Sequence, residues 1–317
     1  MEMRAAAFDQ FGGPEVIEVT QLPVPDLGPG EILIEVSVAG VGQWDPELVS
    51  GSFSDTEVKF PRVIGSDGAG RVRAIGANVK KFKVGDRVYA WGFGNPKGGF
   101  FAEYAVVSQN DAALIPPTIS LEEAGVLAVD GLTALEGLEK VELKKRHSII
   151  IFGANGGVGH LALQLAKVIG AQVFAVASGQ DGVELVLSLG ADAAAEGRSA
   201  RLPQLLERFA PATGYDAALV FAGGNGWELE LAGMKKKGRV AFPNGVEPEP
   251  LPPPGVKLRG YDGEKSPEAF ERLNRLIAQG PFRVVVSKTY PLEQAAQALR
   301  DVRRHHLGKL AIQVKRA

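Results

Sequence analysis

The sequence predicts a two-part α/β chain, with a doubly wound parallel sheet in the middle and a β-rich domain assembled from both ends. Three observations support this prediction. Strand-like runs with many Gly and Pro fill residues 1–115, strand and helix patterns alternate over residues 118–261, and strand-like sequence returns around further helices in residues 262–317. Alternating strands and helices are typical of a parallel sheet covered by helices. We therefore expect one domain from residues 1–117 with 262–317, and a second from residues 118–261.

Short strands dominate the first part. Residues 16–20 and 31–39 alternate between apolar and polar positions or run apolar, as half-buried strands do. Residues 63–72 place several glycines within a strand-like run, which is typical of bulges or close backbone approach. Residues 84–89 predict a turn that leads into another short strand. This spacing favours a barrel-like domain.

The pattern changes after Pro116-Pro117. Ser120 is followed three residues later by Glu123, the spacing of a capping box that starts a helix. A later helix is expected to open at Ser266-Pro267, with Pro at its first position. Residues 248–254 are dense in proline and predict an extended surface loop. The remaining predictions are helices at 132–143, 161–169 and 183–189, and strands at 148–152, 172–177, 217–221, 238–242, 284–290 and 310–314.

A glycine-rich stretch, Gly153-Ala154-Asn155-Gly156-Gly157-Val158-Gly159, joins the apolar run 148–152 to an amphipathic helix. Such a turn lets a pyrophosphate approach backbone N–H groups, and the helix that we expect to begin near Val158 directs the positive end of its dipole at the phosphates. The strand before and the second strand after favour a dinucleotide site. The alternative, a tight glycine turn that binds nothing, stays open.

The end of the second strand bears on the choice of cofactor. NAD sites usually carry an Asp or Glu there for the ribose hydroxyls. This strand ends at Ala177-Ser178-Gly179, and the nearest acid, Asp181, lies beyond the expected contact. Without that carboxylate a 2′-phosphate is not repelled, and the Ser178 hydroxyl can donate to it. NADPH is therefore favoured over NADH.

Composition excludes several classes of function. The chain has no cysteine, so disulfides, thiol nucleophiles and cysteine-ligated zinc are excluded. His305 and His306 are adjacent and would point in different directions on a helix, so no metal site is expected. A net charge of −2 and the absence of a long apolar run predict no nucleic-acid partner and no membrane partner. We expect a cytoplasmic protein.

The sequence resembles the medium-chain dehydrogenase/reductase superfamily, and within it the zinc-free quinone oxidoreductase branch. The resemblance covers essentially the whole chain and implies a Rossmann domain inserted into a GroES-like catalytic domain, with substrate and nicotinamide meeting between the two. Family members are commonly homodimers or homotetramers. The segments that carry it, besides the glycine stretch, are 39–41, 61–67, 84–88, 101–104, 131–134, 189–192, 291–295 and 308–310.

Zinc-dependent relatives hold a catalytic metal with a Cys-His-Cys set. The matching positions here are Gly42, Ser66 and Val129, none of which is a usual zinc ligand. Only residues 92–99 stand where those relatives carry a cysteine-rich lobe. The resemblance therefore predicts chemistry without zinc.

The resemblance also indicates candidate catalytic residues. Relatives have Asn-Pro, with the Asn near the nicotinamide, where this chain has Gly42-Gln43, so Gln43 is a candidate substitute amide shifted by one residue. Trp44 is either an apolar wall for a planar substrate or a core aromatic. Asp45 is either an active-site polar group or a structural one, and Ser66 is a candidate hydrogen-bond partner for the substrate. Relatives also place a Tyr where this chain has Glu47.

Candidate cofactor contacts follow from the glycine stretch and from the resemblance. Thr133 matches a residue at the phosphate or the nicotinamide ribose. Relatives add a Lys and a Tyr for the 2′-phosphate where this chain has Gly182 and Gly197, so Arg198 is the candidate replacement. Lys309 is expected to close over the cofactor. The expected contacts are Thr133, Ala154, Asn155, Gly156, Gly157, Val158, Ser178, Arg198, Ala222 and Lys309.

These residues predict an NADPH-dependent oxidoreductase that transfers hydride to a quinone or to the activated C=C bond of an enone or enal. The two chemistries share a hydride donor and the sequence does not separate them. The alternative is an NADPH-binding structural or redox-sensing protein with little catalysis. A scaffold that keeps the glycine turn only for packing is a third possibility.

Overall fold

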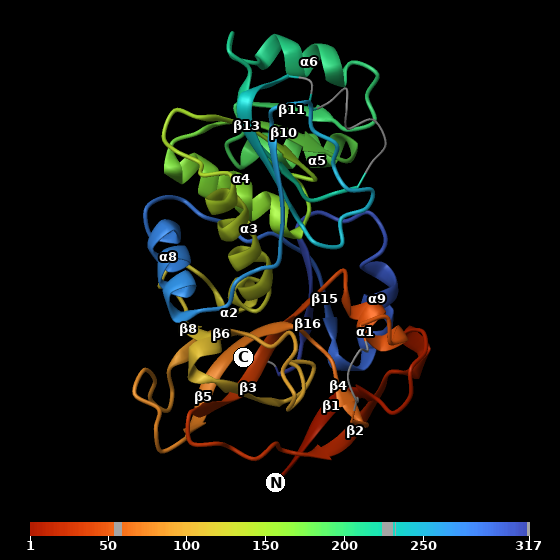
Figure 1. Cartoon of the computed structure of the whole chain (residues 1–317). Helices are drawn as coiled ribbons and strands as arrows, with labels where there is room; N and C mark the ends of the chain where they lie inside the picture. Colours follow the sequence, from red (N-terminus) through yellow and green to blue (C-terminus); the bar gives the residue numbers. More distant parts are fainter. Residues whose placement is uncertain (54–58, 224–230, 232, 316–317) are drawn as a thin grey trace. The chain divides into compact units, whose positions relative to one another are not determined.

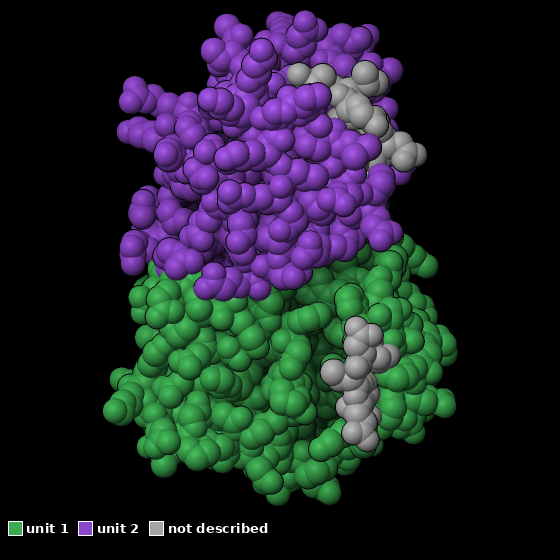
Figure 2. Space-filling model, viewed as in Figure 1, with its two compact units in different colours: residues 1–129, 265–271, 286–317 green, residues 130–264, 272–285 purple. Residues whose placement is uncertain are grey.

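The structure is a computed structural model of the full chain, and it describes residues 1–53, 59–223, 231 and 233–315. Two compact units divide it (Figure 2). Unit 1 contains residues 1–129, 265–271 and 286–317, and unit 2 contains residues 130–264 and 272–285. The first boundary thus lies within helix α3 (Ala128–Lys140), later than the expected position after residue 117. The reason is that the short helix α2 (Leu121–Ala124) contacts strands β3 and β5 of unit 1.

A seven-stranded sheet forms the centre of unit 1 (Figure 1). Its longest strand, β3 (Glu31–Val41), alternates inward and outward side chains and pairs with three neighbours. One of them, β16 (Lys309–Gln313), comes from the C-terminal end, so both ends of the chain build one sheet. The other strands are β5 (Asp67–Ile75), β6 (Arg87–Trp91), β7 (Tyr104–Ser108), β8 (Ala112–Leu114) and β15 (Val286–Pro291).

Smaller elements complete unit 1. Strands β1 (Glu2–Phe8), β2 (Glu18–Pro23) and β4 (Arg62–Val63) form a second sheet. Helices α1 (Asp45–Ser50) and α9 (Ala295–Asp301) contact each other. The start of helix α8 (Pro267–Ile277) also belongs to this unit, where Phe270 meets Tyr89 edge to face.

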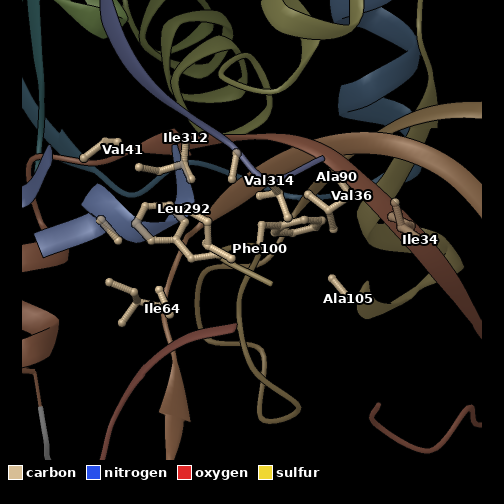
Figure 3. Packing of buried hydrophobic residues seen from close by; sticks show 14 of the residues in the cluster. Ile34, Val36, Val41, Ile64, Ala90, Phe100, Ala105, Leu292, Ile312 and Val314 are labelled. Atoms are coloured by element: carbon tan, nitrogen blue, oxygen red, sulfur yellow. The ribbon is translucent and has the colours of Figure 1, made fainter. Parts of the chain in front are cut away.

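The core of unit 1 draws on distant parts of the sequence (Figure 3). Ile34 and Val36 of β3 share one buried cluster with Phe100, Leu292 and Ile312. All five side chains are essentially inaccessible to solvent, and burying one such side chain contributes roughly 1.5–3 kcal/mol. The apolar face of β3 therefore holds the N-terminal and C-terminal segments together.

Unit 2 is built on a six-stranded parallel sheet with the order β11-β10-β9-β12-β13-β14. The chain order reverses between β9 and β12, and ligands of doubly wound sheets bind at the carboxyl ends beside such a reversal. The strands are β9 (Ser148–Phe152), β10 (Gln172–Ala177), β11 (Ala193–Glu196), β12 (Tyr215–Val220), β13 (Met234–Pro243) and β14 (Lys257–Tyr261), and the helices besides α3 and the end of α8 include α4 (Gly157–Ile169), α5 (Gly179–Ser188) and α6 (Leu202–Phe209).

The predicted fold class is confirmed, as is the capping box of α2, in which Ser120 and Glu123 bond each other's backbone N–H groups. Several predicted bounds are wrong. Helix α4 begins at Gly157, next to the expected start near Val158, but α5 begins at Gly179, four residues earlier than predicted, and α3 spans Ala128–Lys140 instead of 132–143. The strand predicted at 63–72 is interrupted between β4 and β5, where Gly65 adopts a φ of +104°.

Two further bounds differ in unit 1. The strand predicted at 16–20 begins only at Glu18, because Pro14–Val16 forms a 3-10 turn. The strand predicted from residue 284 begins at Val286. Within the described ranges, no helix combines the length and the apolar character that crossing a membrane requires.

Candidate active site and dinucleotide site

The end of strand β3 gathers the candidate catalytic residues of unit 1. Gly40 pairs with Asp67 of β5, and Val41 pairs with Leu310 of β16. Both pairings are antiparallel, so Ser66 and Lys309 lie beside the end of β3 on its two sides. Gly42, Trp44 and Asp45 follow directly along the chain. Two register-defined pairings thus bring together residues far apart in sequence.

Three side chains there form a chain of hydrogen bonds. The indole Nε1 of Trp44 donates to Ser66 Oγ at 2.6 Å, and Ser66 Oγ donates to Asp45 Oδ1 at 3.1 Å. The other carboxylate oxygen of Asp45, Oδ2, accepts from the backbone N–H of Gly42 at 2.8 Å. Asp45 is fully buried and Ser66 is 2% exposed. Trp44 itself is half-buried, and its bond to Ser66 is compatible with an apolar wall for a substrate and with a structural aromatic.

Glycine at position 42 makes room for the indole. A Cβ on Gly42 would lie 2.7 Å from Cζ2 and 2.8 Å from Nε1 of Trp44, far inside van der Waals contact. Residue 42 is the position that the resemblance matches to a cysteine of zinc-dependent relatives. In this chain the space of that side chain is taken by the ring that holds Ser66.

Burial controls the charge of Asp45. Desolvation raises its pKa from 3.8 to about 6, and the bond from Gly42, the Lys309 ammonium and the Ser66 hydroxyl oppose the rise. Nζ of Lys309 lies 5.6 Å from the centroid of a Trp44 ring, so the ammonium also faces the indole. We had expected Lys309 to contact the cofactor; within unit 1 it accompanies the candidate catalytic residues.

A small cavity and an aromatic wall adjoin Ser66. The cavity has a volume of about 20 Å³, and Leu48, Ile64, Ser66 and Phe93 are among its lining residues. Phe93 meets Trp44 edge to face, with ring centroids 6.2 Å apart. Phe53 also meets Phe93 edge to face, with ring centroids 6.2 Å apart, and is 53% exposed. Sequence reasoning named the 92–99 loop but missed Phe93 as a partner of Trp44.

In unit 2 the glycine stretch forms a compact turn from β9 into α4. Gly153 has a φ of +71°, and Gly156 is the N-cap of α4 without a side-chain cap bond. A Cβ on Gly159 would lie 2.7 Å from Cα of Ala154, so this glycine permits close helix–strand contact. The nearest atom to a Cβ on Gly156 is Gly153 O at 3.4 Å, so that side of the turn is open. Such a turn fits a pyrophosphate on the start of α4.

His160 supports this turn from behind. Its Nε2 accepts from the N–H of Val285 at 3.1 Å, and its Nδ1 bonds the carbonyl of Gly156 at 2.8 Å. Because Val285 can only donate, Nδ1 carries the proton and donates to Gly156. His160 is completely buried. Among the histidines it was not singled out from the sequence, and the signal available was its place one residue after Gly159.

Asn155 joins the turn to the end of β10. Its Oδ1 accepts from the N–H of Ser178 at 2.9 Å, and its Nδ2 donates to Ser178 Oγ at 3.1 Å. The N–H of Gly197 donates to the carbonyl of Ala177 at 2.8 Å, which brings the exposed Arg198 to the strand beside Ser178. This edge also carries a carboxylate that the sequence analysis did not weigh, since Glu196 pairs with Ala177.

The other expected cofactor contacts lie in unit 2. Ala222 lies at the glycine turn, because a Cβ on Gly153 would come within 2.9 Å of the Cβ of Ala222. Thr133 lies on α3, and its carbonyl accepts from the Tyr261 hydroxyl at 3.0 Å. Gln43, a candidate catalytic residue, belongs to unit 1, where its side chain is exposed. Ala154, Gly157 and Val158 are part of the turn itself.

Residues that could hold a metal do not cluster. Among the described residues there is no group of three or more His, Cys, Asp or Glu side chains that could bind a metal ion. The three positions that match zinc ligands do lie together in unit 1. Gly42 and Ser66 share Asp45, and the N–H of Val129 donates to Asp67, the neighbour of Ser66, at 3.3 Å.

Comparison with known families agrees with this two-unit arrangement. Residues 28–117 match the alcohol dehydrogenase GroES-like domain, and residues 157–260 match the family described as zinc-binding dehydrogenase. A chloroplastic NADPH-dependent alkenal/one oxidoreductase of Arabidopsis thaliana is 31% identical over 98% of this chain and 79% of its own length. This chain belongs to the quinone oxidoreductase branch of the medium-chain dehydrogenase/reductase superfamily.

Further relatives are similar over nearly the whole chain. The quinone oxidoreductase of Rattus norvegicus is 29% identical over 97% of this chain and 96% of its own length. The solved quinone oxidoreductase from Coxiella burnetii superposes with a TM-score of 0.81 at 27% identity, covering 99% of this chain and all of that one. The predicted family is thereby confirmed.

Proposed function

We propose that this oxidoreductase uses NADPH to reduce a quinone or the activated C=C bond of an enone or enal, without zinc. The observation that carries the proposal is the hydrogen-bonded chain from Trp44 through Ser66 to Asp45. It stands at positions where zinc-dependent relatives hold a metal, and it ends in Gly42, which carries no ligand. The names of the relatives, a quinone oxidoreductase and an alkenal/one oxidoreductase, support both acceptor classes.

The proposed acceptor side is apolar with one polar end. Trp44 and Phe93 offer edge and face contacts to a planar, conjugated acceptor. Ser66 and the ammonium of Lys309 stand at the same place and would stabilise charge that develops on the acceptor oxygen. Bound NADPH would supply the hydride. The chain's own residues orient the acceptor, exclude water and stabilise the developing oxyanion.

We propose NADPH over NADH on the strength of Ser178 and Arg198. The Asn155 amide fixes Ser178 at the end of β10, and Arg198 follows the neighbouring strand. Arg198→Gln should raise KM for NADPH several-fold and leave KM for NADH nearly unchanged. Arg201→Gln, three residues on and also exposed, serves as the charge-matched control. An equal effect of Arg198→Gln on both cofactors would contradict the assignment.

We also propose a homodimer. Within the part of the chain that the structure describes, strand β14 pairs with β13 on one side and forms the edge of the parallel sheet. An edge strand can pair with the same strand of a second copy. Light scattering should give a particle of about twice the chain mass of 33.5 kDa. A homotetramer would extend this arrangement, whereas a monomer at micromolar concentration would contradict it.

Turnover is the direct test of the proposed reaction. Purified protein is mixed with NADPH and either p-benzoquinone, trans-2-hexenal or 4-phenylbut-3-en-2-one, and loss of the NADPH absorbance is followed. We expect acceptor-dependent oxidation that a strong zinc chelator leaves unchanged. If none of the acceptors is reduced although NADPH binds, the proposal fails and the protein is a dinucleotide-binding protein.

A further inference from the structure

The orientation of the hydrogen bonds at Ser66 is fixed by chemistry. An indole N–H only donates, so Ser66 Oγ must accept from Trp44 over their 2.6 Å contact. A hydroxyl has one proton and two acceptor sites. One acceptor site of Ser66 is therefore always used by Trp44. Ser66 therefore has one acceptor site and one proton left. One of the two is used by Asp45, and the other is directed toward the cavity.

The protonation of Asp45 decides that division. Oδ2 of Asp45 accepts from Gly42, so a proton on this carboxyl is placed on Oδ1, the atom that faces Ser66. When Asp45 is ionised, Ser66 donates its proton to Oδ1. When Asp45 is protonated, Oδ1–H donates to Ser66, which must turn its own proton elsewhere. Ser66 lines the small cavity beside Ile64 and Phe93, so its proton can then turn toward this cavity, on the side of Ser66 where we propose that the acceptor binds.

We propose that Ser66 delivers the proton that completes reduction and draws it from Asp45. This inference rests on the proposed function, since it supplies the second half of the same reaction. Hydride addition leaves an enolate, or a hydroquinone monoanion. The Ser66 O–H bond breaks as the O–H bond of the enol or of the hydroquinone forms, and the Asp45 O–H bond breaks as the Ser66 O–H bond forms again. The enol then tautomerises to the saturated carbonyl product. Asp45 is left as a carboxylate and takes a proton from solvent after product release, so acceptor, NADPH and one proton give reduced product and NADP⁺.

The groups around Ser66 and Asp45 favour both proton transfers, from Ser66 to the product and from Asp45 to Ser66. The Trp44 N–H stabilises negative charge on Ser66 Oγ during transfer. The charged groups around Asp45 are Lys309 from β16, which favours the carboxylate left behind, and Glu47 from its own helix, which opposes it. The next residue on β5, Asp67, directs its carboxylate to the N–H of Val129. Burial places the pKa of Asp45 at about 6, so a protonated fraction is present near neutral pH.

Variants of the two residues test the proposal. Ser66→Ala and Asp45→Asn should each lower kcat for the enone by about 10²-fold or more, with smaller changes in KM. The double variant should be no slower than the slower single variant, because both changes interrupt one pathway. Ser66→Thr keeps the hydroxyl and should restore most of the rate. Wild-type kcat should fall as pH rises through the pKa of Asp45, and this fall should be absent in Asp45→Asn.

Two controls separate the possible failures. NADPH affinity and melting temperature of each variant show whether it is folded and binds the cofactor. Wild-type activity that persists in Ser66→Ala would overturn the proton pathway and leave the proposed function standing. Strictly multiplicative losses in the double variant would also overturn it, because they indicate independent roles. Absence of wild-type turnover would instead reject the proposed function.

Discussion

Two glycines of the same turn should respond to the same substitution in opposite ways. A Cβ on Gly159 would stand 2.7 Å from the Cα of Ala154 and closer still to the carbonyl oxygen of Gly153. Both are backbone atoms, so α4 must move away from β9. Overpacking of this kind costs about 1–3 kcal/mol, and each kcal/mol lowers the melting temperature by about 2–4 °C for a unit of this size.

At Gly156 the same methyl group meets only Gly153 O, at 3.4 Å. Its φ of −80° and ψ of −175° suit alanine, so Gly156→Ala should be neutral or stabilising by up to about 1 kcal/mol. The new methyl, however, projects where a pyrophosphate approaches the start of α4. NADPH affinity should fall at least about tenfold, which is about 1.4 kcal/mol.

Thermal melts with and without NADPH separate these effects, because a ligand of the folded state raises the melting temperature. Gly159→Ala should melt early without cofactor. Gly156→Ala should melt like wild type without cofactor and gain much less from NADPH. An undiminished gain in Gly156→Ala would refute the assignment of this turn to the pyrophosphate. An unchanged melting temperature in Gly159→Ala would refute the conclusion that a Cβ at this position overlaps the backbone of residues 153 and 154.

Three further changes test the described contacts. Folded Asp45 holds its proton more tightly than the unfolded chain, so wild type should lose on the order of 3 kcal/mol relative to Asp45→Asn between about pH 4 and pH 7. Urea unfolding at both pH values measures this, and an equal difference at both would contradict the assigned pKa. Ser120→Ala removes one half of the α2 capping box and should cost about 1 kcal/mol, while Ser52→Ala, an exposed control, should cost almost nothing. His160→Ala leaves the N–H of Val285 without its partner, leaves the carbonyl of Gly156 with only the backbone N–H of residue 160, and opens a cavity. The loss should be about 2–5 kcal/mol in the same assay, and a loss below about 1 kcal/mol would show that water replaces the ring.

The sequence predicted the interior strands of unit 2 well, because continuous apolar runs such as 148–152 and 172–177 have few other stable placements. It missed the first turn of α5. That turn contains two glycines, Gly179 and Gly182, whose low helix propensity hides the start of a helix. The backbone adopts helix there because α5 packs against β10 and β11.

The candidate site was predictable residue by residue but not as an arrangement. Trp44 and Asp45 follow a predicted strand and could be singled out, as could Ser66. Their mutual bonds depend on the pairing of Gly40 with Asp67, and a shift of one residue in that pairing would turn Ser66 to the opposite face. No local pattern in the sequence encodes that register. The same reason hid Phe93, whose contact with Trp44 joins two loops 49 positions apart in the numbering.

The residues at positions 42, 44 and 66, two of which the resemblance matches to metal ligands of zinc-dependent relatives, depend on one another. Without a side chain at Gly42, the Trp44 indole can lie against the backbone, and only there does its N–H reach Ser66. A serine at position 66 is small enough to accept that bond and still meet Asp45. A bulkier residue at 42 would displace the indole and leave the buried Ser66 hydroxyl with fewer partners, at a cost of about 1–3 kcal/mol. The absence of ligand side chains at 42 and 66 is thus the condition for the polar chain that takes their place.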